Sequence, residues 1–106
     1  MEIAGYLIQT DQQLVTLAQS GDAAAFEMLF NRYRDGIRKL YLARTGGNGN
    51  DADDLLQETF IKVYINLHKY DTAFTFGQWI YPIARNTFLD FVRGARHALS
   101  CYPPPP

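Results

Sequence analysis

The chain has 106 residues, of which 47% are apolar and 14% aromatic, a composition that excludes a largely disordered protein. Its net charge of -1 gives no global sign of a nucleic-acid partner, and its one cysteine, Cys101, excludes an internal disulfide and a thiolate metal cluster. The single cysteine fits a reducing, cytoplasmic location. No apolar run is long enough to cross a membrane, and we expect no membrane insertion, no metal and no cofactor.

Local start signals predict the first two helices. The first follows Thr10, which forms a capping box with Gln13, and it ends near residue 20. The second follows Asp22 and carries apolar residues at spacings of three and four as far as Tyr41. Both are therefore predicted as amphipathic helices.

A glycine-rich turn over residues 45–50 separates the second helix from the third. Three glycines in this segment make a helix entropically costly. The third helix is predicted to begin near residue 50 or 51, where acidic side chains favour a helix start, and to run to about His68.

The fourth helix begins with a second capping box, formed by Thr75 and Gln78, and is predicted to reach Arg93 or beyond. Pro82 lies in its interior, where a proline costs up to about 3 kcal/mol unless the helix bends. We therefore expect a bend at Pro82. If the helix started at Pro82 instead, Trp79 would lie in the preceding loop.

These segments predict an all-α fold, a small bundle of about four helices, because no alternating strand pattern occurs. We place the helical domain at residues 10–97. It is preceded by an N-terminal segment, 1–9, and followed by a proline-rich tail, 98–106.

The third helix has two contrasting faces. Its predicted core side holds Leu56, Phe60, Val63 and Leu67, flanked by Leu55 and Tyr64. Its opposite side holds Asp54, Gln57, Glu58, Ile61 and Ile65. This second pattern fits a wide helix buried on two sides, or stray surface isoleucines, or a docking site for a basic partner helix.

The fourth helix also has a second face. Its predicted core stripe comprises Trp79, Ile80, Ile83, Ala84, Thr87, Phe88 and Phe91. The other side holds Arg85, Asn86, Arg93 and Arg96, together with Gln78 and Leu89. Basic side chains next to the aromatic-rich loop 70–76 are typical of a surface for single-stranded nucleic acid, although three arginines also fit an ordinary solvated helix.

The two halves of the chain differ in charge. Residues 1–60 hold five basic and nine acidic side chains, a charge of -4, whereas residues 61–106 hold five basic and two acidic ones, a charge of +3. The acidic half contains most of the second face of the third helix, and the basic half contains the arginines of the fourth.

Four motifs follow one another along residues 10–96. They are Asp11-Gln12-Gln13-Leu14-Val15, Gly21-Asp22-Ala23-Ala24-Ala25-Phe26-Glu27, Asp54-x-x-Gln57-Glu58-x-Phe60 and Trp79-x-x-x-Ile83-Ala84-Arg85-Asn86. Together they resemble region 2 of bacterial sigma factors, of the extracytoplasmic-function type. The third and fourth motifs are the most specific, because they occur in the expected order and at the expected distance.

The resemblance implies a role in transcription initiation without enzymatic chemistry. The third-helix face would dock on the clamp helices of the RNA polymerase β′ subunit. The fourth helix and the loop before it would open promoter DNA and read the minus-ten element as non-template single strand, with one base flipped into a pocket. By matched position, Asn86 would contact a base, Arg85, Arg93 and Arg96 would hold phosphates, and Tyr70 and Phe74 would wall the pocket.

Two departures from the family pattern keep an alternative open. Pro82 stands where the family usually carries a basic residue, and the 106 residues do not include the second, helix-turn-helix domain of full-length members. The alternative is a stand-alone module that binds polymerase or an anti-sigma factor without productive promoter binding. An enzyme is not expected, because neither His68 nor His97 lies in a nucleophile-base arrangement.

Overall fold

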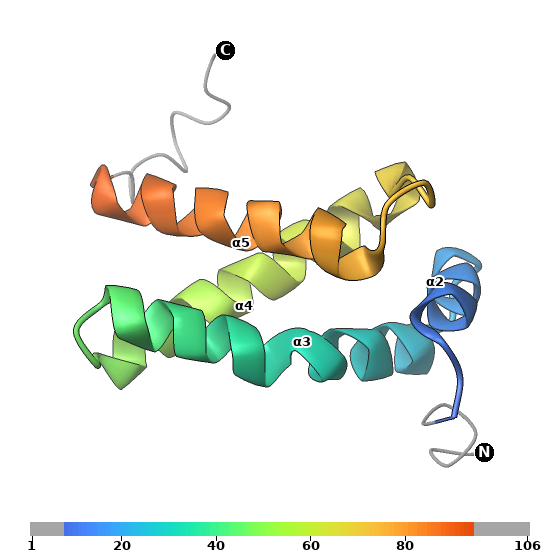
Figure 1. Cartoon of the computed structure of the whole chain (residues 1–106), viewed down its shortest axis with the longest axis horizontal. Coiled ribbons are helices and arrows are strands. Elements are labelled where there is room, and N and C mark those ends of the chain that lie inside the picture. The colour runs from blue at the N-terminus through green and yellow to red at the C-terminus, as the bar shows by residue number, and fades with distance from the viewer. Residues whose placement is uncertain (1–7, 95–106) are drawn as a thin grey trace.

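The computed structural model describes residues 8–94, which form four α-helices and one turn of 3-10 helix (Figure 1). The helices are α2 (Asp11–Gln19), α3 (Ala23–Arg44), α4 (Gly49–Asn66), η1 (Leu67–Lys69) and α5 (Phe76–Val92). In Figure 1, α4 crosses behind α3 and α5, and α2 lies at one end of α3. The predicted all-α bundle is thus confirmed, while the predicted tail, 98–106, lies outside the described residues.

Three of the helix starts are where the capping signals predicted them. The Thr10 hydroxyl accepts a hydrogen bond from the Gln13 amide at 3.1 Å, and the Gln13 side chain accepts one from the Thr10 amide at 2.8 Å. Thr75 and Gln78 form the same reciprocal pair at 3.1 and 2.9 Å. The Asp22 carboxylate caps α3. Each cap satisfies amides that the first helical turn leaves without a partner.

The third predicted helix is displaced toward the N-terminus. The Asn48 side chain accepts a hydrogen bond from the Asp51 amide at 3.0 Å, so α4 begins at Gly49 rather than at residue 50 or 51. It ends at Asn66, and His68 lies in η1 rather than in the α-helix. Gly49 is tolerated because it occupies the first helical position, outside the interior where glycine is most costly.

Pro82 lies inside α5, which is continuous from Phe76 to Val92. The alternative in which the helix starts at Pro82 is therefore wrong, and Trp79 is helical. The bend at Pro82 stays a prediction.

Tyr41 stands at the centre of the bundle and is fully buried. Its hydroxyl lies 2.6 Å from the Thr59 hydroxyl of α4 and donates to the Ala84 carbonyl of α5 at 2.8 Å. One side chain of α3 thus joins three helices. Leu29 and Ile80, each with no exposed surface, belong to the same core.

The core side of α4 differs from the prediction by about one residue. The buried positions of α4 are Ala52, Leu55, Thr59 and Val63. Leu56 and Phe60, which were predicted to be central, are only partly buried, and Tyr64 is 58% exposed. The helix is rotated because Thr59 can be buried at no polar cost, with its hydroxyl bonded to the Leu55 carbonyl at 2.7 Å and placed beside Tyr41.

Candidate nucleic-acid and protein interface

The second face of α4 is exposed along its whole length. Its five residues are Asp54, Gln57, Glu58, Ile61 and Ile65, and we call them the docking face. Ile61 is 50% exposed and Ile65 58%. The interpretation that this helix is buried on two sides is therefore wrong, because no described element covers these residues.

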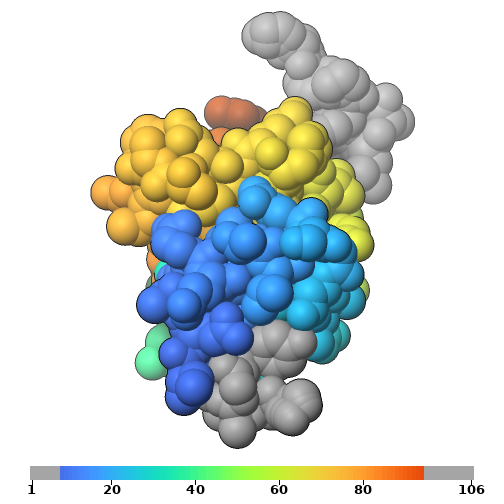
Figure 2. Space-filling model, turned by 90° about the vertical axis from the view of Figure 1, so that its right-hand side faces the viewer, coloured from blue at the N-terminus to red at the C-terminus, as the bar shows by residue number. Residues whose placement is uncertain are grey.

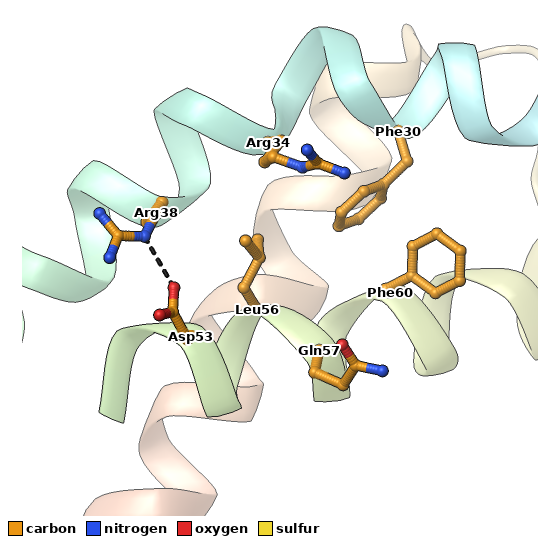
Figure 3. Close-up of a pocket in the computed structure, with 7 residues that line it drawn as sticks. All are labelled: Phe30, Arg34, Arg38, Asp53, Leu56, Gln57 and Phe60. Atoms are coloured by element: carbon orange, nitrogen blue, oxygen red, sulfur yellow. Dashed lines mark hydrogen bonds and ion pairs between the residues drawn. The ribbon is translucent and has the colours of Figure 1, made fainter. Parts of the chain in front are cut away.

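A groove of about 490 Å³ lies between α3 and α4, beside the docking face (Figure 3). Its lining residues are Phe30, Arg34, Arg38, Asp53, Leu56, Gln57 and Phe60. Arg38 and Asp53 form an ion pair of 2.8 Å at one end of the groove, and the rings of Phe30 and Phe60 lie at the other. That ion pair raises the pKa of the Arg38 guanidinium, first through its hydrogen bond to Asp53.

Sequence reasoning missed the α3 wall of this groove. Arg34 and Arg38 are four residues apart, which places them on one side of a helix, and this spacing was the available signal. Leu56 had been assigned to the core, but in the structure it helps to form the groove floor next to Gln57. The docking face thus continues across a groove of mixed polar and apolar lining to two arginines on α3.

The second face of α5 is exposed as well. Arg85, Asn86 and Leu89 are all exposed, and the Arg93 side chain is 70% exposed. We call Arg85, Asn86 and Arg93 the basic face; Arg96, which was predicted to extend it, lies outside the described residues.

A lysine that sequence reasoning left unassigned joins α4 to this basic face. The Lys62 ammonium lies 3.4 Å from the Glu58 carboxylate of the docking face and 3.6 Å from the Asp90 carboxylate of α5. It also donates to the Thr87 hydroxyl at 3.3 Å. Asp90 in turn lies 4.0 Å from the Arg93 guanidinium. The docking face and the basic face therefore meet at one partly buried charge cluster.

The loop before α5 carries the two aromatic residues predicted to wall a base pocket, and they lie in different environments. The Phe74 side chain is 52% exposed at the loop surface. Tyr70 is only 6% exposed, and its ring packs against Phe76 and Trp79 at centroid distances of 5.6 and 5.3 Å. Phe74 can offer a ring face to a base, whereas Tyr70 supports the loop from beneath.

Residues 8–94 contain no group of histidine, cysteine, aspartate and glutamate side chains arranged to hold a metal ion. Over the same stretch, every helix is too short or too polar to span a lipid bilayer.

Comparison with known proteins identifies the family. The family model of sigma-70 region 2 matches residues 29–98. The chain is 37% identical over 86 residues to an ECF RNA polymerase sigma-E factor of Haemophilus influenzae, covering 78% of this chain and 43% of the relative. It is also 37% identical over 75 residues to the ECF RNA polymerase sigma factor SigW of Bacillus subtilis, covering 71% and 40%.

A solved structure extends the match to three dimensions. It is an engineered region 2 of sigmaE, determined by NMR in complex with GTAAAA, with a TM-score of 0.74 and 34% identity. The alignment covers 89% of this chain and 93% of that one. By contrast, the chain spans only about two fifths of the length of the curated relatives above. These matches show that the chain belongs to the sigma-70 region 2 family, of the extracytoplasmic-function type.

Proposed function

We propose that this chain is the part of a sigma factor that binds RNA polymerase and opens the minus-ten element of a promoter. The docking face on α4 would bind the clamp helices of the polymerase β′ subunit. The basic face on α5 and the loop before it would bind the non-template single strand. The proposed role is binding rather than bond chemistry, in the cytoplasm where polymerase and promoter meet.

The observation that carries the proposal is the match to a region 2 solved in complex with GTAAAA, of which this chain covers 93%. It agrees with the exposure of Phe74, in the loop before α5, and of Asn86, within α5. Unstacking a base costs a few kcal/mol, and stacking on an exposed ring together with a hydrogen bond to a base edge offsets that cost.

The polymerase role rests on the chemistry of the docking face. Ile61 and Ile65 are half exposed, and covering each would contribute roughly 1 kcal/mol or more. Asp54, Gln57 and Glu58 lie beside them, and they offer two carboxylates and one amide to a basic helix. The adjoining groove, with Arg34 at its α3 wall, would widen this contact.

Removing the polar part of the docking face tests the polymerase role. The Gln57→Ala, Glu58→Ala double variant should lose binding to core polymerase, or to an isolated β′ clamp-helix fragment, in a fluorescence anisotropy titration. Its stability should change by no more than about 0.5 kcal/mol, because the Glu58–Lys62 pair is an i,i+4 pair and Lys62 keeps its contacts to Asp90 and Thr87 when Glu58 is removed.

The control is Asp35→Ala, which removes an exposed carboxylate from α3 on a side of the helix that does not line the groove. It should bind polymerase as the wild type does. Equal binding by the Gln57→Ala, Glu58→Ala variant and this control would contradict the assignment of the docking face.

Single substitutions on the basic face test the DNA role. Arg93→Ala should lower affinity for single-stranded hexamers equally across sequences and should reduce the salt dependence by about one phosphate contact. Asn86→Ala should instead relax the preference at one base. Lys39→Ala, which removes an exposed cation from α3, is the control. If Arg93→Ala and Lys39→Ala behave alike, the basic face does not bind DNA.

One observation favours a second candidate, a module that binds polymerase or an anti-sigma factor without productive promoter binding. Asp90 lies beside both Lys62 and Arg93, so a carboxylate offsets positive charge next to the basic face. Normal polymerase binding combined with no sequence-dependent binding of hexamers, even in the presence of polymerase, would establish this candidate instead.

A further inference from the structure

The Tyr70 hydroxyl joins two distant parts of the molecule. It accepts a hydrogen bond from the Gln12 side-chain amide of α2 at 3.0 Å and donates its own proton to the Phe74 carbonyl. A phenol has one proton to donate, and Tyr70 donates it to the Phe74 carbonyl. The hydroxyl oxygen can therefore only accept from Gln12, which is the donor in the second bond. A phenylalanine at this position would keep the ring packing but form neither bond.

The loop that Tyr70 begins is otherwise organised by local contacts. The Asp71 side chain accepts from the Ala73 amide at 2.9 Å, and the Asp71 carbonyl accepts from the Phe74 amide at 3.0 Å. These bonds shape the turn but do not attach it to the bundle. The bond from Tyr70 to the Phe74 carbonyl does, because the Tyr70 ring is packed against Phe76 and Trp79.

Helix α2 lies directly against this part of the chain. Figure 2 shows the α2 side chains below the segment around residue 70. Gln12 and Gln19 are seven residues apart and so share one side of α2; the Gln19 side chain donates to the Leu67 carbonyl at 3.0 Å. Two glutamines of α2 therefore hold the chain at Leu67 and at Tyr70, on the approach to the loop.

We infer that the Tyr70 hydroxyl, held by Gln12, is a positioning group for base recognition, and that it sets the conformation of the loop Asp71–Thr75 before DNA arrives. This inference rests on the proposed function and adds α2 to the machinery that reads DNA, although α2 need not touch it. A loop ordered in advance spares the cost of ordering it during binding. It also keeps the exposed Phe74 ring at one place relative to Asn86, so that a flipped base meets a defined pocket.

The test compares Tyr70→Phe, Gln12→Ala and the double variant with the wild type. The probe is the single-stranded hexamer GTAAAA, with six further hexamers that each change one base. Tyr70→Phe should weaken binding of the best hexamer about threefold to tenfold, the range expected for one or two lost hydrogen bonds. It should also bring the affinities for the best hexamer and for the substituted hexamers closer together. Gln12→Ala should have a smaller effect of the same kind. The double variant should be no weaker than Tyr70→Phe alone, because both bonds pass through one hydroxyl.

Tyr41→Phe is the matched control, since it also removes a buried hydroxyl that makes two contacts, but in the centre of the bundle. It should lower thermal stability without changing the ratio between hexamers. If Tyr70→Phe discriminates between hexamers as the wild type does, or if it changes them only as Tyr41→Phe does, Tyr70 has a structural role alone and the inference is overturned.

Amide hydrogen exchange separates this inference from the proposed function. Without DNA, Tyr70→Phe should speed exchange at the Ala73 and Phe74 amides, whereas Tyr41→Phe should not do so selectively. If the wild type binds none of the hexamers but Tyr70→Phe still speeds exchange in the loop, the proposed function is overturned and Tyr70 remains the loop anchor. Unchanged loop exchange would overturn the anchoring itself.

Discussion

Substitution of Tyr41 by phenylalanine tests how the three long helices are held together. Tyr41 has no exposed surface, and its hydroxyl contacts Thr59 of α4 at 2.6 Å and the Ala84 carbonyl of α5 at 2.8 Å. Phenylalanine fills the same ring volume but removes both contacts. The perturbation is therefore a loss of hydrogen bonding with little change in packing.

The size of the effect follows from the burial of these groups. A net hydrogen bond contributes about 0.5 to 1.5 kcal/mol, so two together contribute about 1 to 3 kcal/mol. The two hydroxyls share two protons, and Tyr41 donates one of them to the Ala84 carbonyl. In the phenylalanine variant Thr59 can still donate its proton to the Leu55 carbonyl at 2.7 Å, which places the expected loss near the middle, about 2 kcal/mol. For a domain of this size, such a loss lowers the melting temperature by roughly 8 to 16 °C.

The assay is urea and thermal unfolding followed by circular dichroism. Tyr64→Phe is the matched control, because Tyr64 is 58% exposed on α4 and phenylalanine there should leave stability within about 0.5 kcal/mol of the wild type. The denaturant slope should stay the same in both variants, since neither changes the surface exposed on unfolding. A Tyr41→Phe variant as stable as Tyr64→Phe would refute the reasoning that this hydroxyl links the helices.

Two further predictions concern the same bundle. Burial raises the pKa of Tyr41 to about 12, and burial together with the Asp11 hydrogen bond raises the pKa of Tyr33. These tyrosines ionise near pH 10 in the unfolded chain, so their contribution to the free energy of unfolding should be complete below about pH 10 and should be lost as the pH rises through their folded-state pKa values. Urea unfolding at several alkaline pH values checks this, and Tyr41→Phe should show a shallower loss; an identical slope in both proteins would contradict it. A Cβ atom on Gly36 would lie 2.6 Å from the Tyr81 hydroxyl oxygen. Alanine in place of this helical glycine should therefore raise the free energy of unfolding by about 0.5 to 1 kcal/mol only when Tyr81→Phe has removed that hydroxyl. A double-mutant cycle measures this coupling, and the same change in unfolding free energy in both backgrounds would exclude the close contact.

The helix starts show how far local signals reach. The caps at Thr10, Asp22 and Thr75 were predicted correctly because each involves a side chain and an amide only three residues away. The start of α4 was missed because Asn48 was read as part of a flexible glycine-rich turn, whereas its side chain caps Asp51. Here too the contact is local, but the glycines around it weakened the signal.

The candidate site was predicted in part. Helical spacing predicted that the docking face and the basic face are exposed, and the structure confirms this exposure. Their binding roles stay predictions. The groove was not predicted, since its walls come from two helices and depend on how α3 and α4 cross. Tyr70 was expected at the pocket wall as a DNA contact, and the structure instead buries its ring below the loop.

The sequence by itself determined the helices, their caps and the family motifs, because these depend on residues within one or two turns of one another. The tertiary structure alone decided which side of α4 is buried and that the Tyr70 ring is buried below the loop. Thr59 is buried beside its hydrogen-bond partner Tyr41, which lies 18 residues earlier in the sequence. The Tyr70 hydroxyl accepts a hydrogen bond from Gln12, which lies 58 residues earlier. Such partners share no period with the helix that carries the residue, and only the packing of the helices brings their polar atoms within hydrogen-bond distance.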